Sequence, residues 1–249
     1  MRGYKLLNFP VLAGMFSVIA SGCNGNEISN CPLLSADQSA SLMAPALDFP
    51  LTVAVDPRFT LRENTYISQA VHKWNAFGQN TIGHDLFKAV SGTVPGNLME
   101  TTPMDCGRLS DLDAKTLFVV RELNEDNWKS MGFNPGIPGA TFRCTGGGSL
   151  TAQSIFIYDQ FIYSENQGAN QFESVILHEL GHTLGLDHSC IDKSGQPNYA
   201  ACANLPDSHP YHQAVMFPSL RMRLLNGPEI KETLSSNDQS RTRCLLNAY

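Results

Sequence analysis

The chain has 249 residues, of which 42% are hydrophobic and 16% are charged, and its formal net charge is −6. This length suits one large domain with a sizeable core, and the composition excludes collagen-like and wholly disordered chains. The acidic balance argues against a nucleic-acid partner, because nucleic-acid binders present basic surfaces. A multi-span membrane protein is also excluded, since only one apolar run is long enough to matter for membranes.

Residues 1–22 predict a signal peptide. Basic residues within the first five positions precede an uncharged, mostly apolar run that ends in small residues. This order is typical of a secretory signal. The segment 19–23, Ile-Ala-Ser-Gly-Cys, resembles a bacterial lipobox, which implies cleavage before Cys23 and lipid attachment to that residue. Ordinary cleavage near Gly22, which would give a soluble secreted protein, is the alternative.

The cysteine count supports the lipobox interpretation. Seven cysteines leave one spare thiol in an exported protein, and lipidation of Cys23 leaves six for disulfides in an oxidising compartment. The expected pairs are Cys190–Cys202, which closes a short loop, Cys106–Cys144 and Cys31–Cys244. Other pairings and buried free thiols stay open. We expect an exported protein that is lipid-anchored on the bacterial cell envelope or otherwise secreted, and that meets the membrane only through the anchor.

The pattern of the chain changes after a linker at residues 23–47, which is rich in Asn, Ser, Gly, Pro and Ala. Alternating apolar residues at 51–55 predict a strand. Apolar residues spaced by three and four over 60–80 predict an amphipathic helix, with Thr60 and Glu63 as its capping box. Residues 48–249 are expected to form a single domain.

Further elements follow within this domain. Strands are expected at 86–90, 116–123, 140–144 and 155–158, and the one at 140–144 is expected to be an edge strand. Helices are expected at 171–184 and within 234–249, where Ser235 or Ser236 caps the helix. The two strands that flank the first helix can form a crossover unit, so we expect an α+β fold with a twisted mixed sheet and three main helices.

The most informative segment runs from His178 to His188, with the sequence His-Glu-Leu-Gly-His-Thr-Leu-Gly-Leu-Asp-His. His178 and His182 are four residues apart on one helix face and can bind one Zn²⁺. Glu179 lies where it can meet a zinc-bound water. Gly185 permits a sharp turn at the end of the helix, which allows His188 to supply the third ligand and leaves the fourth position open.

This segment resembles the zinc motif of the metzincin endopeptidases. Met216, in Ala-Val-Met-Phe-Pro-Ser, fits the methionine turn of that clan, and Ser189 and Pro218 are most similar to its matrixin branch. The resemblance implies a zincin-like catalytic domain with a zinc cleft over residues 48–249. One departure is the segment between His188 and Met216, which is longer than matrixins usually show. We find no structural-zinc or calcium loop of the matrixin kind.

The resemblance implies a zinc-dependent endopeptidase whose metal activates water while Glu179 accepts the proton as general base. A protein or peptide substrate would lie extended along an edge strand, at 140–144 or just before Ile155. We expect a monomer. Two alternatives remain, namely a non-catalytic zinc-containing surface-binding or adhesion module on the same fold, and a zinc hydrolase for non-peptide substrates. The intact Glu179 favours an enzyme, because a binding module needs no base there.

Overall fold

The computed structural model describes residues 49–90, 92–98, 106, 114–146, 149–160, 169–190, 201–218, 222–223, 227–228 and 230–247. These residues all belong to one compact unit, Cys31–Tyr249. The expected signal peptide, the linker and Cys23 lie outside the described residues. Among the helices that are described, none is long and apolar enough to cross a membrane.

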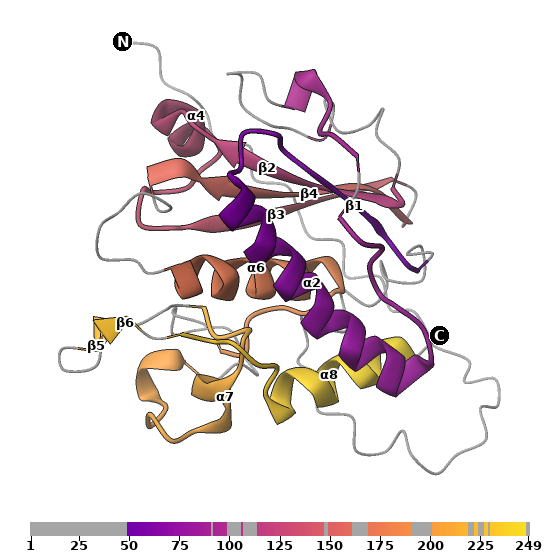
Figure 1. Ribbon diagram of the computed structural model, residues 1–249. Helices are drawn as coiled ribbons and strands as arrows, with labels where there is room; N and C mark the ends of the chain where they lie inside the picture. The colour runs from indigo at the N-terminus through magenta and orange to yellow at the C-terminus, as the bar shows by residue number, and fades with distance from the viewer. Residues whose placement is uncertain are drawn as a thin grey trace, which may run out of the picture. The chain divides into compact units, whose positions relative to one another are not determined.

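A four-stranded sheet forms the centre of this unit (Figure 1). Its strands are β1 (Thr52–Val55), β2 (Thr116–Glu122), β3 (Gly139–Gly146) and β4 (Ser149–Tyr158), in the order β1-β2-β4-β3. β1, β2 and β4 are parallel, and β3 is antiparallel to β4 at the edge. The mixed sheet and its edge strand are therefore as the sequence predicts. β4 begins earlier than expected because its first half carries polar residues that hide the strand pattern.

The prediction of a strand at residues 86–90 is wrong, because these residues, which the structure describes, form no regular strand. This segment makes one isolated bridge, Phe87 to Leu51, and a second bridge joins Thr93 to Val55 of β1. The reason is the side chain of Asn75, whose Oδ1 accepts hydrogen bonds from the amides of Leu86 and Phe87. The Asn75 amide nitrogen also donates to the Phe87 carbonyl over 2.8 Å. The segment is thus held by the Asn75 side chain and by two backbone hydrogen bonds to Leu51, which do not extend into a regular ladder.

Two long helices cover one face of the sheet (Figure 1). α2 (Leu61–Ile82) begins with the expected capping box of Thr60 and Glu63. α6 (Ala169–Thr183) packs beside it, and the Trp74 indole of α2 donates to the Leu177 carbonyl of α6 over 3.0 Å. Together they enclose the larger core, which includes Ile67, Trp74, Val119, Ile155, Ile157, Ile176 and Leu180.

The remaining elements are shorter. α8 (Ser236–Asn247) is capped by Ser235, whose hydroxyl accepts from the Asp238 amide over 3.3 Å. α4 (Glu125–Ser130) lies on the opposite face of the sheet, where Trp128 stacks on Tyr158 with ring centroids 5.4 Å apart. The elements η3 (Gly96–Leu98), η4 (Cys202–Asn204), α7 (Pro210–Gln213), β5 (Met222–Arg223) and β6 (Gly227–Pro228) are also present. These and α4 are too short for periodicity to predict them.

Two disulfides join the pairs that the sequence favours. Cys106 is bonded to Cys144 of β3, and Cys190 is bonded to Cys202. Cys244 is disulfide-bonded as well, and its expected partner Cys31 lies outside the described residues. Disulfides persist in oxidising compartments, so they favour an exported protein.

Candidate metal centre

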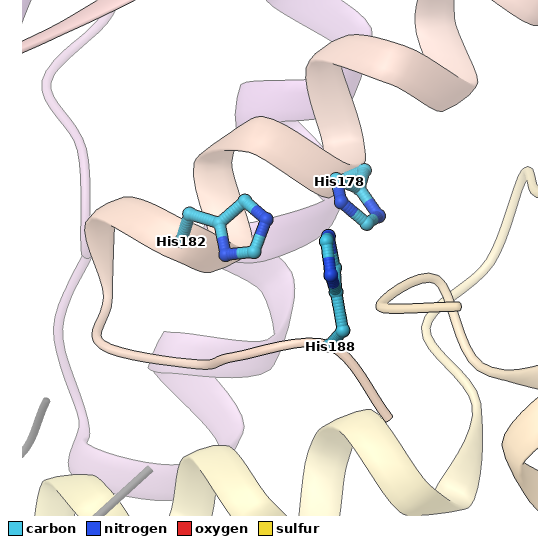
Figure 2. A group of neighbouring side chains, drawn as sticks. All are labelled: His178, His182 and His188. Carbon is cyan, nitrogen blue, oxygen red and sulfur yellow. The ribbon is translucent and has the colours of Figure 1, made fainter. Parts of the chain in front are cut away.

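Three histidines converge at the end of α6. Figure 2 shows His178 and His182 on the helix and His188 on the segment that follows, with their rings turned toward one another. One nitrogen from each ring lies within 4.8 Å of the others, and the ring centroids are 4.7, 5.2 and 4.9 Å apart. Within the described part of the chain, no other group of three His, Cys, Asp or Glu side chains is close enough to hold a metal ion.

The turn that brings His188 back is built on Gly185. Its φ is +96°, in the left-handed region that glycine adopts without strain. The Leu186 amide donates to the Gly181 carbonyl over 3.1 Å, and the Gly185 amide donates to the His182 carbonyl over 3.1 Å. This pair of bonds is a Schellman motif, which ends the helix and reverses the chain. Gly185 therefore lies where the helix-ending turn is expected.

Backbone carbonyls select the tautomer of the two helical histidines. His178 Nδ1 lies 2.7 Å from the Val215 carbonyl oxygen, and His182 Nδ1 lies 2.8 Å from that of Leu186. A carbonyl oxygen only accepts, so each Nδ1 carries the proton and each Nε2 keeps its lone pair for a ligand. Metal-binding histidines are commonly oriented in this way.

Burial keeps the three imidazoles neutral. It lowers the pKa of His178 and His188, and it lowers the pKa of His182 well below its ordinary value. Neighbouring charges modify this effect at His188, where Asp187 raises the pKa and Arg241 lowers it. Three neutral imidazoles are a donor set that suits catalytic Zn²⁺, and within the described residues no fourth side chain joins the group, so the residues present fit that metal.

Met216 lies directly against the zinc-motif helix. Its carbonyl accepts from the Ser189 amide over 2.8 Å, and its side chain is fully buried. A Cβ placed on Gly181 would lie 2.3 Å from the Met216 sulfur, so any side chain at that helix position would require Met216 to shift. Sequence reasoning missed Gly181. A glycine inside a helical pattern was the available signal, because such a residue usually has a packing reason.

A buried carboxylate of α8 supports the turn that carries Met216. The Asp238 side chain accepts from the Val215 amide over 2.8 Å and from the Met216 amide over 3.1 Å. Since the Val215 carbonyl in turn accepts from His178, Asp238 acts on the metal centre through the backbone. The sequence indicates only a helix cap near Asp238, so this role could not be predicted from its local pattern.

Glu179 lies next to His178 on α6 and faces the edge strand β3. It is 5% exposed, and its Oε2 accepts from the Thr141 hydroxyl over 2.6 Å. Burial raises the pKa of Glu179, whereas the neighbouring His178 and the Thr141 hydrogen bond lower it. A buried carboxyl of this kind beside three ligand histidines can serve as a proton carrier for chemistry at the metal.

The disulfide cysteines that the structure describes are not part of the metal group. The Cys190–Cys202 disulfide begins two residues after His188 and lies between that histidine and Met216 in the chain. Cys144 of the other disulfide lies on β3. His212 is buried, with its Nε2 3.1 Å from the Leu205 carbonyl oxygen.

The family model described as matrixin matches residues 102–204. Curated proteins give no significant match. Among solved structures, the GM1-bound form of the ECX AB5 holotoxin shares 14% identity, with 82% of each chain covered and a TM-score of 0.42. Myroilysin shares 14% identity, with 82% of this chain and 84% of that chain covered and a TM-score of 0.38.

The two structural likenesses are too distant to bear on the activity of this chain. The matrixin match includes the whole zinc motif from His178 to His188 and ends before Met216. The three histidines of that motif form the group that could hold a metal ion. Residues 102–204, which carry the zinc motif, are therefore similar to the matrixin family, and the three histidines of that motif are grouped so that they could hold a metal ion.

Proposed function

We propose that the protein is a zinc-dependent endopeptidase. The observation that carries this proposal is the convergence of three neutral imidazoles with the buried carboxyl of Glu179, beside a sheet edge. The matrixin match supports a metallopeptidase at the level of the family. Nε2 of His178, of His182 and a ring nitrogen of His188 would hold the metal. Zinc, when bound, supplies a Lewis acid that activates water and polarises a scissile carbonyl.

Glu179 moves the proton in this proposal. Its Oε2 is engaged by Thr141, which leaves Oε1 to accept the proton of the attacking water. The carboxyl then donates that proton to the nitrogen of the leaving amine. The raised pKa suits this role, because a general base that must also act as an acid works best with a pKa closer to neutral.

The position of β3 at the edge of the sheet favours a substrate that is a peptide in extended form. Among the residues that the structure describes, β3 pairs with β4 along one side only, and no strand lies along its other side. A peptide in extended form can add to such an edge through backbone hydrogen bonds. The segment just before Ile155 does not suit this role, because it lies in β4 and pairs with β2 on one side and β3 on the other.

The test separates an endopeptidase from a zinc-containing binding module. The zinc-loaded protein should degrade an unfolded protein such as reduced casein, and a chelator should stop the reaction. Glu179→Gln keeps the three ligands, so zinc should stay near the parental content while hydrolysis falls by about 10²–10⁴-fold. A Glu179→Gln variant as fast as the parent would refute the role of Glu179. A zinc-loaded parent that cleaves no protein or peptide would favour the binding module.

We also propose that the protein is exported as a monomer with a lipid anchor at Cys23. The disulfides favour export, and the anchor rests on the small residues before Cys23 and on the odd number of cysteines. Cys23→Ala should release the protein from the membrane fraction or block its processing, whereas Cys23 in the parent should carry lipid. Mass spectrometry that shows an unmodified N-terminus on the mature parent would contradict the anchor.

A further inference from the structure

The carboxylate of Glu179 is enclosed by two residues of the edge strand β3. Gly139 and Thr141 are two positions apart, so they lie on the same face of that strand. The Thr141 hydroxyl oxygen is 2.6 Å from Glu179 Oε2 and 3.1 Å from the Glu179 backbone oxygen. A hydroxyl has a single hydrogen, and the shorter distance and the charge of the carboxylate favour the bond to Oε2.

Gly139 makes room for the other side of the same carboxylate. A Cβ at this position would lie 3.1 Å from Glu179 Oε1, 3.2 Å from Glu179 Cγ and 2.8 Å from Val175 Cγ1. Any side chain at 139 would therefore press on the Glu179 side chain and on its helix. The strand thus places a hydrogen-bond donor beside one oxygen of the carboxylate and a residue without a side chain beside the other.

Glu179 needs such support, because its side chain has several rotatable bonds. Within the part of the chain that the structure describes, Thr141 is the only side chain that hydrogen-bonds this carboxylate, and no ion pair holds it. A catalytic group must be held close to its productive geometry, and small displacements cost much of the rate. One hydroxyl therefore has a large influence on where the carboxylate points.

We infer that Thr141 is the positioning residue of the general base, fixing one oxygen of Glu179 so that the other faces the reacting water. This inference rests on the proposed endopeptidase function. It also links two parts of that function, because the strand that would receive the substrate is the strand that holds the base. Thr141 itself transfers no proton, and it acts only through the orientation of Glu179.

The test compares variants of Thr141 in the zinc-loaded full chain. Thr141→Val keeps the shape and loses the donor, so kcat should fall by about 10- to 100-fold, as expected for a lost hydrogen bond to a charged group. KM and zinc content should stay near the parental values, because neither the metal ligands nor the strand edge changes. Thr141→Ser keeps the donor and should recover most of kcat. Thr65→Val is the matched control, since Thr65 is an exposed helix residue whose hydroxyl bonds only a backbone carbonyl.

A second measurement does not depend on activity. In a double-mutant cycle on thermal unfolding, Thr141→Val should lower the melting temperature less when Glu179 is already Ala than in the parent, because the shared contact is gone. If Thr141→Val fails to fold, the comparison of Thr141→Ala with Thr141→Ser decides the same question.

The outcomes separate this inference from the proposed function. A parent without peptidase activity refutes the proposed function, and the role of Thr141 falls with it. An active parent in which the Val and Ser variants have equal kcat refutes only the positioning role. Equal losses in the Val variant and in Thr65→Val, or additive effects in the unfolding cycle, refute it as well. A loss of kcat that Ser restores, with zinc and KM unchanged, supports it.

Discussion

His182 and His178 share one helix, but the carbonyl that orients the His182 ring is close to it in the sequence, whereas the carbonyl that orients the His178 ring is far from it. The partner of His182 is Leu186, four residues away in the turn that ends α6. The partner of His178 is Val215, 37 residues away. The first support is part of the zinc motif itself. The second depends on a separate segment being folded onto the helix.

The remote support is itself held by a further element. The Val215 and Met216 amides bond to the Asp238 carboxylate on α8, and the Ser189 amide bonds to the Met216 carbonyl. Met216 also packs on Gly181, between the two helical histidines. The metal centre therefore combines a local unit that the motif specifies and a remote unit that tertiary packing specifies. Variants can test each unit separately.

The largest effect is expected from removing a ligand of the local unit. His182→Ala takes away one imidazole, so zinc binding and peptidase activity should be lost together. Elemental analysis of the purified protein, beside casein hydrolysis, measures both. His72→Ala is the control, because His72 is an exposed residue of α2 outside the metal group, and it should change neither quantity. Full zinc content in His182→Ala would contradict the ligand assignment.

The same division explains what the sequence could predict. The positions of His178, Glu179, His182, Gly185 and His188 follow from helical spacing and from the backbone freedom of glycine, so a local pattern reveals them. Periodicity likewise predicts α2, α6, α8 and the mixed sheet. Residues that act across long separations leave no such pattern.

Three findings show where local patterns fail. Thr141 reads as an ordinary strand residue, although it holds Glu179 from 38 positions away. Asp238 reads as a helix cap, although it also supports the Met216 turn. The segment 86–90 has the composition of a strand, but the side chain of Asn75 takes two of its amides and one of its carbonyls. In each case a tertiary contact decides the structure, and one sequence alone does not show that contact.

An intermediate effect is expected from weakening the remote unit without touching a ligand. Asp238→Asn keeps the shape, but an amide has fewer acceptor sites than a carboxylate for the three backbone amides and the Ser235 hydroxyl that donate to it. The Val215 carbonyl should then hold the His178 ring less firmly, and zinc affinity should fall by about 10- to 100-fold, as is typical for residues that orient metal ligands. Competition with a chromophoric chelator measures this affinity.

Asp126→Asn is the matched control for that variant. Asp126 is an exposed acidic residue in the first turn of α4, and α4 lies on the opposite face of the sheet from α6. Its substitution should leave zinc affinity unchanged. If Asp238→Asn binds zinc as tightly as the control, the Asp238 carboxylate does not help to hold the His178 ring, and this part of the comparison between the two histidines is wrong.

The smallest effect is expected from Gly181→Ala, which disturbs the contact between the two units. The new methyl group would meet the Met216 sulfur at 2.3 Å, and the Trp74 ring lies 3.4 Å away on another side. Overpacking of a buried site costs about 1–3 kcal/mol, and the better helix propensity of alanine offsets about 1 kcal/mol of that. The net result should be a modest loss in the free energy of unfolding, measured by urea denaturation.

Gly96→Ala is the control, because a Cβ there meets nothing within 4 Å. Combining Gly181→Ala with Met216→Ala should cost less than the sum of the two single changes. The truncated residue 216 makes room for the new methyl group, and the methyl group fills part of the space that the sulfur leaves. Additive losses, or a Gly181→Ala variant as stable as the parent, would mean that the Met216 turn does not press on the helix at this point.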